Sequence, residues 1–172
     1  CVTGDTTVAA ASKPAPRAAT WRSYAGIGSS QRLVRRGGQG PGRPLVFLHG
    51  EMSSSRVVLP LATAAGATRP YLAMDVAGNG ESDPLGAGAA LSDYAADVGA
   101  VLHAAGIDSY DRYGEGAGAA LALELAAQDV DGVGKVVLDQ PVFADDDARA
   151  DLIANFAPSI EAKWDGSHWL TG

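Results

Sequence analysis

The stretch Tyr113-Gly114-Glu115-Gly116-Ala117-Gly118-Ala119-Ala120 decides the fold expected for this chain. It joins a short segment, Tyr110 to Tyr113, to an unbroken apolar run from Ala119 to Ala127. Alternating glycines between two such segments predict a strand, a turn too tight for side chains, and a buried helix. The third residue of the turn is Gly116, so the position at its tip has no side chain.

The composition limits the classes of protein to which the chain can belong. With 172 residues and an apolar fraction of 47%, it can bury a core and is most simply one domain. Its net charge of −7 argues against nucleic acid and anionic membranes as partners. No apolar stretch approaches the roughly 20 residues of a membrane span. A single cysteine excludes an intramolecular disulfide and a Cys-based metal cluster, and we expect neither metal nor cofactor.

The first residues form a predicted tether, residues 1–20. The chain begins at Cys1, and Val2 to Thr20 is rich in Thr, Ala and Pro, which leaves it little to bury. Two interpretations of this start stay open. A trimmed chain leaves the location unknown or cytoplasmic, whereas a bacterial lipoprotein with an acylated Cys1 would lie in the cell envelope.

The residues after the tether alternate between predicted strands and helices. Continuous apolar runs are typical of strands buried on both faces of a parallel sheet, and spacing of about 3.6 residues indicates amphipathic helices. This order predicts an α/β fold with a doubly wound, mostly parallel sheet. The expected elements are two short strands within 21–36, of which 30–36 lies at an edge, strands at 44–50, 71–76, 110–113 and 134–140, and helices at 57–65, 92–105 and 119–127.

The helix ends carry recognisable signals. Serines 53–55 offer caps for the first helix, and Ser92 is the expected cap of the second, which Gly106 ends. On that second helix, Leu91 belongs to the predicted apolar face, whereas Asp93 and Asp97 fall on the polar face. The acidic run 145–147 is interpreted as a solvated helix N-terminus, because consecutive carboxylates cannot all face one metal ion.

Four sequence features are expected to meet at one edge of the sheet. The His49-Gly50 pair, Asp75, the glycine turn and Asp139 each fall at the carboxyl end of a predicted strand. Sites in parallel sheets form at the carboxyl ends of the strands. Asp75 is interpreted as structural, accepting backbone N–H bonds at its turn, and Asp139 as a possible catalytic acid.

In this order and spacing, the motifs resemble those of the α/β-hydrolase superfamily. The resemblance is carried by Leu45 to Gly50, by Asp75 to Asp83, and by Gly114-x-Gly116-x-Gly118, which matches the G-x-S-x-G nucleophile elbow. It covers about residues 20 to 150 and implies hydrolysis of an ester, amide or related bond of a small-molecule substrate. It divides the chain into the tether, a hydrolase-like core at 21–143, and the start of a helical cap at 144–172.

The resemblance also implies roles for individual residues. The backbone N–H groups of Glu51 and Ala117 would donate to an oxyanion, and Asp139 matches an alternative placement of the triad acid. Gly116 stands at the nucleophile position and cannot form a covalent intermediate. The missing side chain predicts an open space before the two N–H groups, suited to a carboxylate, a water or a small anion. Glu115 is expected to point away from it.

The triad histidine has no counterpart at the expected place. His49 belongs to the strand-end turn and is interpreted as structural, His103 lies on a helix and is expected to be solvated, and His168 falls in the predicted cap. The family has two further strands after the cap, so the sheet is expected to lack its last strands. Residues 136–138 would then form an apolar edge, and we expect an oligomer or a complementing chain.

Two functions stay open from the sequence. The first is a hydrolase-like protein, inactive alone, in which Gly116 is either an engineered removal of a nucleophile or a natural variation. The second is a non-catalytic binding or scaffold protein. The N-myc downstream-regulated proteins use a similar fold in this way, and the similarity to them is confined to the glycine elbow.

Overall fold

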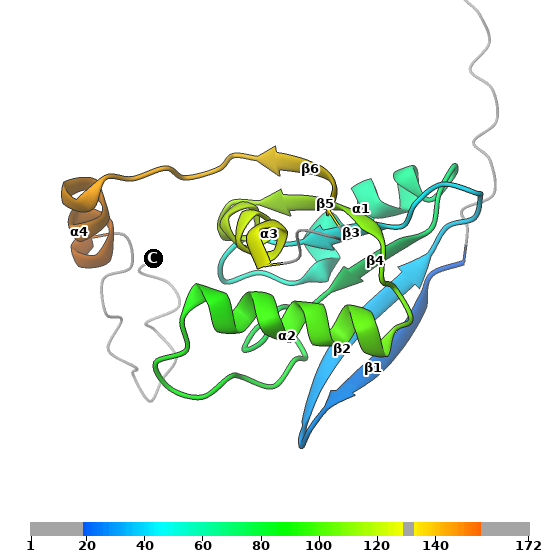
Figure 1. The fold of residues 1–172 in the computed structure, drawn as a ribbon, viewed down its shortest axis with the longest axis horizontal. Coiled ribbons are helices and arrows are strands. Elements are labelled where there is room, and N and C mark those ends of the chain that lie inside the picture. Colours follow the sequence, from blue (N-terminus) through cyan, green and yellow to red (C-terminus); the bar gives the residue numbers. More distant parts are fainter. Residues whose placement is uncertain (1–18, 129–132, 156–172) are drawn as a thin grey trace, which may run out of the picture. The chain divides into compact units, whose positions relative to one another are not determined.

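The computed structural model describes residues 19–128 and 133–155 (Figure 1). Among these residues, no helix has the length and apolar character that a membrane crossing requires. The described elements, in chain order, are β1 (Trp21–Ile27), β2 (Ser30–Gly37), β3 (Leu45–Leu48), α1 (Ser55–Ala65), β4 (Tyr71–Met74), α2 (Leu91–Ala104), β5 (Tyr110–Glu115), α3 (Ala117–Gln128), β6 (Val133–Asp139) and α4 (Asp146–Asn155).

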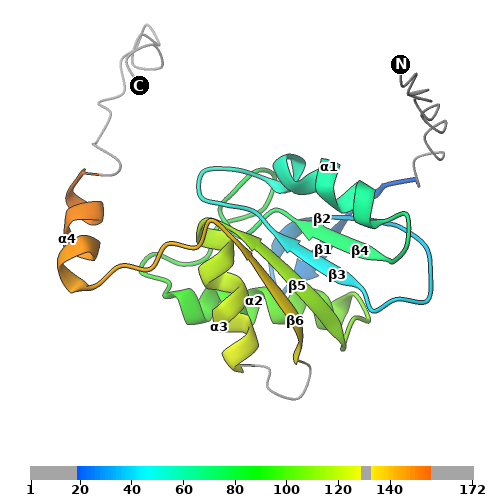
Figure 2. The same cartoon turned by 90° about the horizontal axis from the view of Figure 1, so that it is seen from above.

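The described strands form one mixed sheet in the order β1-β2-β4-β3-β5-β6. Strands β4, β3, β5 and β6 run parallel to one another, whereas β1 pairs antiparallel with β2 and β2 pairs antiparallel with β4. Helix α1 covers one face, and α2 and α3 cover the other (Figure 2). The doubly wound, mostly parallel sheet that the sequence predicts is therefore confirmed.

The central strands supply a core on each face of the sheet. In β3, Val46 and Leu48 belong to the core under α2 and α3, whereas Phe47 belongs to the smaller core under α1. All three side chains are fully buried. This burial on both faces explains why β3 is a continuous apolar run instead of an alternating one.

The position of β2 differs from the sequence-based prediction. Residues 30–36 were expected at an edge, but β2 lies between β1 and β4, and β1 takes the edge. The guanidinium of Arg32 is buried and donates to both carboxylate oxygens of Asp97 on α2, each at 2.8 Å. The assignment of Asp97 to the polar face of the helix was thus wrong, because a charged side chain can be buried once it is paired.

The ends of α1 and α2 match the predicted signals in part. Ser54 caps α1, its hydroxyl accepting the Arg56 N–H at 3.4 Å. The prediction that Ser92 caps α2 is wrong, because α2 already begins at Leu91. At this end of the helix the Asp93 carboxylate accepts the N–H of Ala90 at 2.8 Å. Leu91 itself is exposed instead of belonging to the apolar face. The end of α2 at Gly106 is confirmed, with φ +70° at that glycine.

Residues 142–172 make up a second compact unit. Its described part holds α4, where the Asp145 carboxylate accepts the N–H of Ala148 at 2.9 Å. Asp146 and Asp147 lie in the first turn, so the acidic run is the helix N-terminus expected from the sequence. Residues 1–18, which include Cys1 and most of the predicted tether, lie outside the described residues, as does His168 of the predicted cap. The two interpretations of the start at Cys1 therefore stay open. The domain limits stay predictions.

The N-terminus of α3 approaches β3 more closely than any side chain would permit. A Cβ atom on Gly118 would overlap the backbone carbonyl oxygens of Leu48 and His49, and one on Gly114 would overlap the carbonyl oxygen of Gly118. Backbone atoms cannot move aside as a flexible side chain can. These two glycines therefore set the distance between helix and sheet, which confirms the turn too tight for side chains.

We expect Gly118→Ala to lower the free energy of unfolding by about 3 kcal/mol or more, because overpacking against rigid backbone has no cheap relaxation. The matched control is Gly99→Ala inside α2, where the nearest atom to a new Cβ is Leu125 Cδ1 at 3.9 Å. That change should raise stability by about 0.5–1 kcal/mol through helix propensity. Urea denaturation of both variants checks this, and a Gly118→Ala variant as stable as wild type would contradict it.

Candidate functional site

The predicted features meet at the carboxyl ends of the parallel strands. Leu48 pairs with Met74 of β4 and Gly114 of β5, and Gly114 pairs with Leu138 of β6. The residues that follow these positions therefore reach the same edge of the sheet. The prediction that four features lie at one edge of the sheet is confirmed for His49, Asp75, the elbow and Asp139. Their side chains, however, point in different directions.

Asp75 organises the loops around this edge. Its Oδ1 accepts the N–H of Ser55 at 2.8 Å and the Ser55 hydroxyl at 2.5 Å, and its Oδ2 accepts the N–H of Glu81 at 2.9 Å. The Asp75 carboxylate is buried and thus fixes both the start of α1 and the loop after β4. The structural interpretation of Asp75 is confirmed.

His49 is committed to the same loops. Its Nε2 accepts the N–H of Val76 at 3.0 Å, and Nδ1 lies 2.7 Å from the Gly50 carbonyl oxygen. An acceptor at Nε2 and a donor at Nδ1 define a neutral imidazole whose two nitrogens are both occupied. The structural interpretation of His49 is confirmed. His103 is exposed on α2, where its Nδ1 lies 3.4 Å from Asp108, away from the strand ends.

Gly116 forms the tip of the elbow between β5 and α3. Its φ of +55° lies in the left-handed region, which a residue with a side chain adopts only under strain. Its N–H donates to the carbonyl oxygen of Asp139 at 3.0 Å, which ties the elbow to the end of β6. Helix α3 begins at the next residue, Ala117, so the Ala117 N–H is one of the donors that the helix itself leaves unpaired.

The space in front of that donor is filled by the side chain of Glu51. Its Oε2 accepts the Ala117 N–H at 2.9 Å. Hydrogen bonds from the backbone N–H groups of Glu51 itself and of Ala117 lower the pKa of the Glu51 carboxyl below its ordinary value, against a smaller opposing effect of burial. An ideal Cβ on Gly116 would lie 2.8 Å from Oε2. The open space expected from the sequence is therefore taken by a carboxylate.

The side chain of Glu51 belongs to the candidate site, and the sequence-based prediction missed it because it assigned this residue a backbone role alone. The available signal was an acidic residue directly after a strand-ending His-Gly pair, facing an elbow whose tip is glycine. The sequence does not fix the direction of that side chain. The Ala117 N–H meets the Glu51 side chain, and the role of the two backbone N–H groups toward an oxyanion stays a prediction.

Asp139 turns its side chain elsewhere. Its Oδ2 accepts the hydroxyl of Tyr113 at 2.5 Å, and Tyr113 packs against Phe47 in the core under α1. Burial, followed by the bond to Asp139, raises the pKa of the Tyr113 hydroxyl above its ordinary range. Neither Asp139 nor Glu115 lines the cavity beside Glu51, and the role of Asp139 as an acid stays a prediction.

A cavity of about 260 Å³ adjoins the Glu51 carboxylate. Its walls come from the loops after β3 and β4 and from the starts of α2 and α3. Most of the lining side chains are apolar, and the polar ones include His49, Glu51 and Asn79. The lining consists of His49, Gly50, Glu51, Met52, Val76, Asn79, Leu91, Tyr94, Ala117, Gly118 and Leu121.

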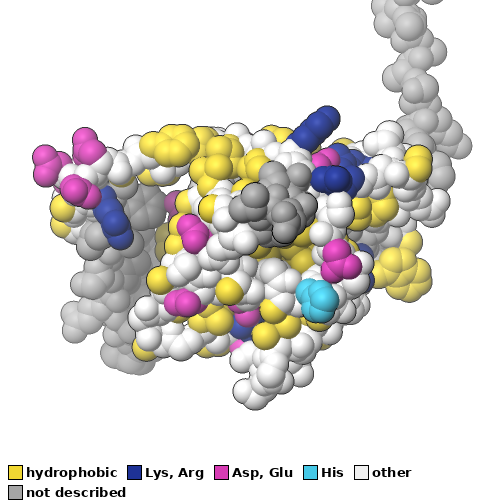
Figure 3. Space-filling view, viewed as in Figure 1, with side chains coloured by type: hydrophobic (Ala, Val, Ile, Leu, Met, Phe, Trp, Pro, Cys, Tyr) yellow, Lys and Arg dark blue, Asp and Glu magenta, His cyan; other side chains and the backbone are white. Residues whose placement is uncertain are grey.

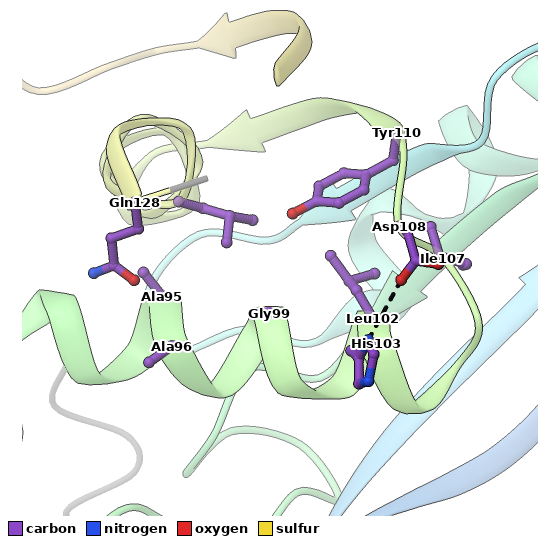
Figure 4. A pocket seen from close by; sticks show the side chains of 10 residues that line it. Ala95, Ala96, Gly99, Leu102, His103, Ile107, Asp108, Tyr110 and Gln128 are labelled. Carbon is purple, nitrogen blue, oxygen red and sulfur yellow. Dashed lines mark hydrogen bonds and ion pairs between the residues drawn. The ribbon is translucent and has the colours of Figure 1, made fainter. Parts of the chain in front are cut away.

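A larger cavity of about 400 Å³ lies between α2 and α3 (Figure 4). Figure 4 shows Leu102 and Tyr110 beside it, with the His103–Asp108 pair at one end. Tyr110 starts β5, so this cavity lies at the amino end of the strand, opposite the elbow. Because sites of parallel sheets form at the carboxyl ends, the cavity beside Glu51 is the candidate site. Within the described part of the chain, no group of three or more acidic, His or Cys side chains is placed to hold a metal ion.

Comparison with known proteins assigns the family. The family model of the alpha/beta hydrolase fold matches residues 43–163. The chain belongs to the α/β-hydrolase fold family, as its sheet order and elbow indicate. A search of curated protein sequences gave no match.

Solved structures of the same fold are similar to the chain. ALR0039 of Nostoc sp. PCC 7120 matches with a TM-score of 0.69 and 19% identity, over 81% of this chain and 53% of its own. Cfl2 of Burkholderia cenocepacia has a TM-score of 0.66 and 21% identity, over 70% and 41%. The naproxen esterase of Bacillus subtilis has a TM-score of 0.63 and 22% identity, over 69% and 42%. The chain thus spans about half or less of the length of these structures.

We expect Gly116→Ala to cost about 1 kcal/mol of unfolding free energy, because alanine is strained at this positive φ. The new Cβ should also displace the Glu51 carboxylate from its donors. Losing those N–H bonds removes the effect that lowers the pKa of Glu51, so the pKa should rise toward its ordinary value. Urea denaturation and an NMR titration of the Glu51 carboxyl check the two effects.

Gly106→Ala is the matched control for this change. Gly106 has φ +70°, and no heavy atom lies within 4 Å of the position that a Cβ atom would take there. It should show the strain alone, about 1 kcal/mol, and leave the pKa of Glu51 unchanged. An unshifted Glu51 pKa in Gly116→Ala would contradict the displacement.

Proposed function

We propose that this chain has the architecture of a hydrolase of esters, amides or related bonds and does not carry out that reaction alone. The observation that carries the proposal is the elbow itself, where Gly116 leaves no nucleophile and the Glu51 carboxylate fills the donor site. The fold family supports hydrolysis as the ancestral reaction, and Gly116 accounts for its loss.

Three requirements of covalent hydrolysis are unmet at this elbow. A nucleophilic oxygen or sulfur is missing at Gly116, and a general base is needed beside it. Among the described histidines, His49 is neutral with both nitrogens engaged, and His103 is remote on α2. An oxyanion would also have to form beside the negative Glu51 carboxylate, which would repel it instead of stabilising it.

The alternative is a non-catalytic binding role for the same site, or a scaffold role for the fold. The binding role is favoured by the cavity of about 260 Å³ that adjoins two backbone N–H donors. Such a combination of an apolar wall and a few convergent polar groups is typical of small-molecule sites. A small molecule is therefore the expected partner under either function.

We expect no hydrolysis of p-nitrophenyl esters by this chain above the buffer rate, since nucleophile and base are both missing from the elbow. Gly116→Ser should not restore activity, and neither should the double variant Gly116→Ser with Glu51→Ala, because each lacks a base. A stopped colorimetric assay at neutral pH measures all three proteins.

Turnover by the wild-type chain that survives repurification and is lost on substitution of Glu115 or Asp139 would overturn this proposal. Rapid turnover by Gly116→Ser would show instead that a base is available and that the glycine alone silences the site.

The outer edge of β6 supports a proposal about assembly. β6 ends the strand order, and Val137 on it is 51% exposed, whereas Val136 and Leu138 pack against the main core. Figure 3 shows hydrophobic side chains near the carboxyl end of β6. An exposed apolar edge strand offers unpaired backbone groups to another chain. We propose that this edge pairs with a second copy or with a complementing chain.

We expect light scattering at high concentration to give a mass above the 17.4 kDa of one chain. Val137→Lys should return the protein to a monomer, because a lysine on an edge strand opposes pairing. Val57→Lys is the matched control, since Val57 is similarly exposed on α1, away from the edge. A soluble wild-type monomer at high concentration would overturn the proposal.

A further inference from the structure

The outer edge of β6 presents backbone groups at alternate residues. The Lys135 N–H donates to a side chain of β5 at 2.9 Å, and the Asp139 carbonyl oxygen accepts an N–H of the elbow at 3.0 Å. The backbone groups of these two residues therefore point toward β5. Because N–H and C=O groups alternate sides along a strand, those of Val136 and Leu138 point away from it. On that side the described sheet has no further strand.

The side chains of β6 on the face of α1 have a charge at each end. Val137 lies opposite Tyr113 in the ladder, and the Asp139 carboxylate accepts the Tyr113 hydroxyl at 2.5 Å. Both side chains thus share the face of the smaller core. Lys135 directs its backbone toward β5 as Asp139 does, so its exposed side chain lies on the same face. This face of β6 carries the pattern Lys-x-Val-x-Asp.

The regular part of the β6 edge is short. The β5–β6 ladder shifts register before Val136. At the other end, Gln140 has φ +49°, which ends the extended backbone directly after Asp139. An added strand can therefore pair with few residues, and the match of those residues decides how it binds.

The pattern is complementary to itself when a second copy of β6 runs antiparallel. With Val137 opposite the partner's Val137, the outward groups of Val136 face those of the partner's Leu138. These two residues then exchange both backbone hydrogen bonds, and their apolar side chains meet on the face of α3. On the face of α1, Lys135 lies opposite the partner's Asp139.

Other antiparallel registers lose part of this match. A shift by one residue brings outward backbone groups opposite groups that point toward β5, so they stay unbonded. Centring the pair on Val136 or on Leu138 places Val137 opposite one of the charged side chains. A lysine on an edge strand ordinarily opposes pairing, whereas here it favours the one register in which it meets a carboxylate.

We propose that β6 pairs antiparallel with β6 of a second copy, with Val137 opposite the partner's Val137 and Lys135 opposite the partner's Asp139. The two-fold axis passes between the valines, so the charged pair occurs twice in each dimer. Val137, 51% exposed in one chain, becomes covered by its counterpart. This inference deepens the assembly proposed above, which left the partner open, and rests on it.

Charge variants of the full 172-residue chain test the register. Lys135→Asp brings two carboxylates opposite each other, and Asp139→Lys brings two ammonium groups together. Each variant alone should dimerise about tenfold more weakly than wild type or worse, because like charges directly opposite repel. An equimolar mixture of the two should regain the wild-type affinity, since every contact in the mixed dimer again joins opposite charges. Analytical ultracentrifugation measures these affinities.

The matched control for the charge change is Arg56→Asp. Arg56 lies on α1 with its side chain 70% exposed, and the substitution alters the net charge by the same amount as Lys135→Asp. It should leave the dimer affinity unchanged.

Cross-linking tests the central pair of the register. Cys1→Ser removes the native thiol, and Val137→Cys in that background should form a disulfide between two copies when oxidised glutathione is added. Opposite residues of this kind have Cα atoms roughly 4.5 Å apart, which a disulfide can span. Val57→Cys, similarly exposed on α1, should stay unlinked. Non-reducing gel electrophoresis distinguishes the two.

Support requires both the recovery in the mixture and the cross-link at position 137. A wild-type oligomer that lacks either would overturn this register and leave the proposed assembly standing. A monomeric wild type at high concentration would overturn both. Should Asp139→Lys fail to fold because it loses the bond to Tyr113, the cross-link decides alone.

Discussion

The close contact between the start of α3 and the end of β3 determines the rest of the site. Gly118 permits it, because any side chain there would overlap the carbonyl oxygens of Leu48 and His49. The contact brings the Ala117 N–H beside the loop that follows His49-Gly50. A helix held farther from the sheet would leave Glu51 and Ala117 without a common point, and the donor pair would not exist.

Buried polar side chains fix the positions of the loops around this contact. Asp75 joins the start of α1 to the loop after β4 through Ser55 and Glu81, and His49 joins the ends of β3 and β4. Each group is buried and bonded on more than one side, as low-dielectric surroundings require. The loops around the cavity are therefore fixed by hydrogen bonds, whereas the Glu51 side chain is held by its end alone.

The absence of a side chain at position 116 affects the electrostatics of the elbow. If position 116 carried a side chain, its Cβ would lie 2.8 Å from the present position of Glu51 Oε2, so the carboxylate could not remain there. With glycine, the partial positive charge at the start of α3 is neutralised from within the chain. The donor at the start of α3 thus already faces a negative charge.

The sequence alone determined the order of strands and helices, the doubly wound sheet and the edge at which the motifs meet. Apolar runs such as Leu45 to Leu48 and the glycine spacing of the elbow are local signals, because burial and tight turns act on neighbouring residues. The structural roles of Asp75 and His49 could also be predicted from their places at strand ends. Only the tertiary structure decided that β2 lies inside the sheet, that Arg32 and Asp97 form a buried pair, that Asp139 turns to Tyr113 and that Glu51 fills the donor site. These outcomes depend on which distant groups meet and on side-chain directions, and no local pattern of residues encodes either.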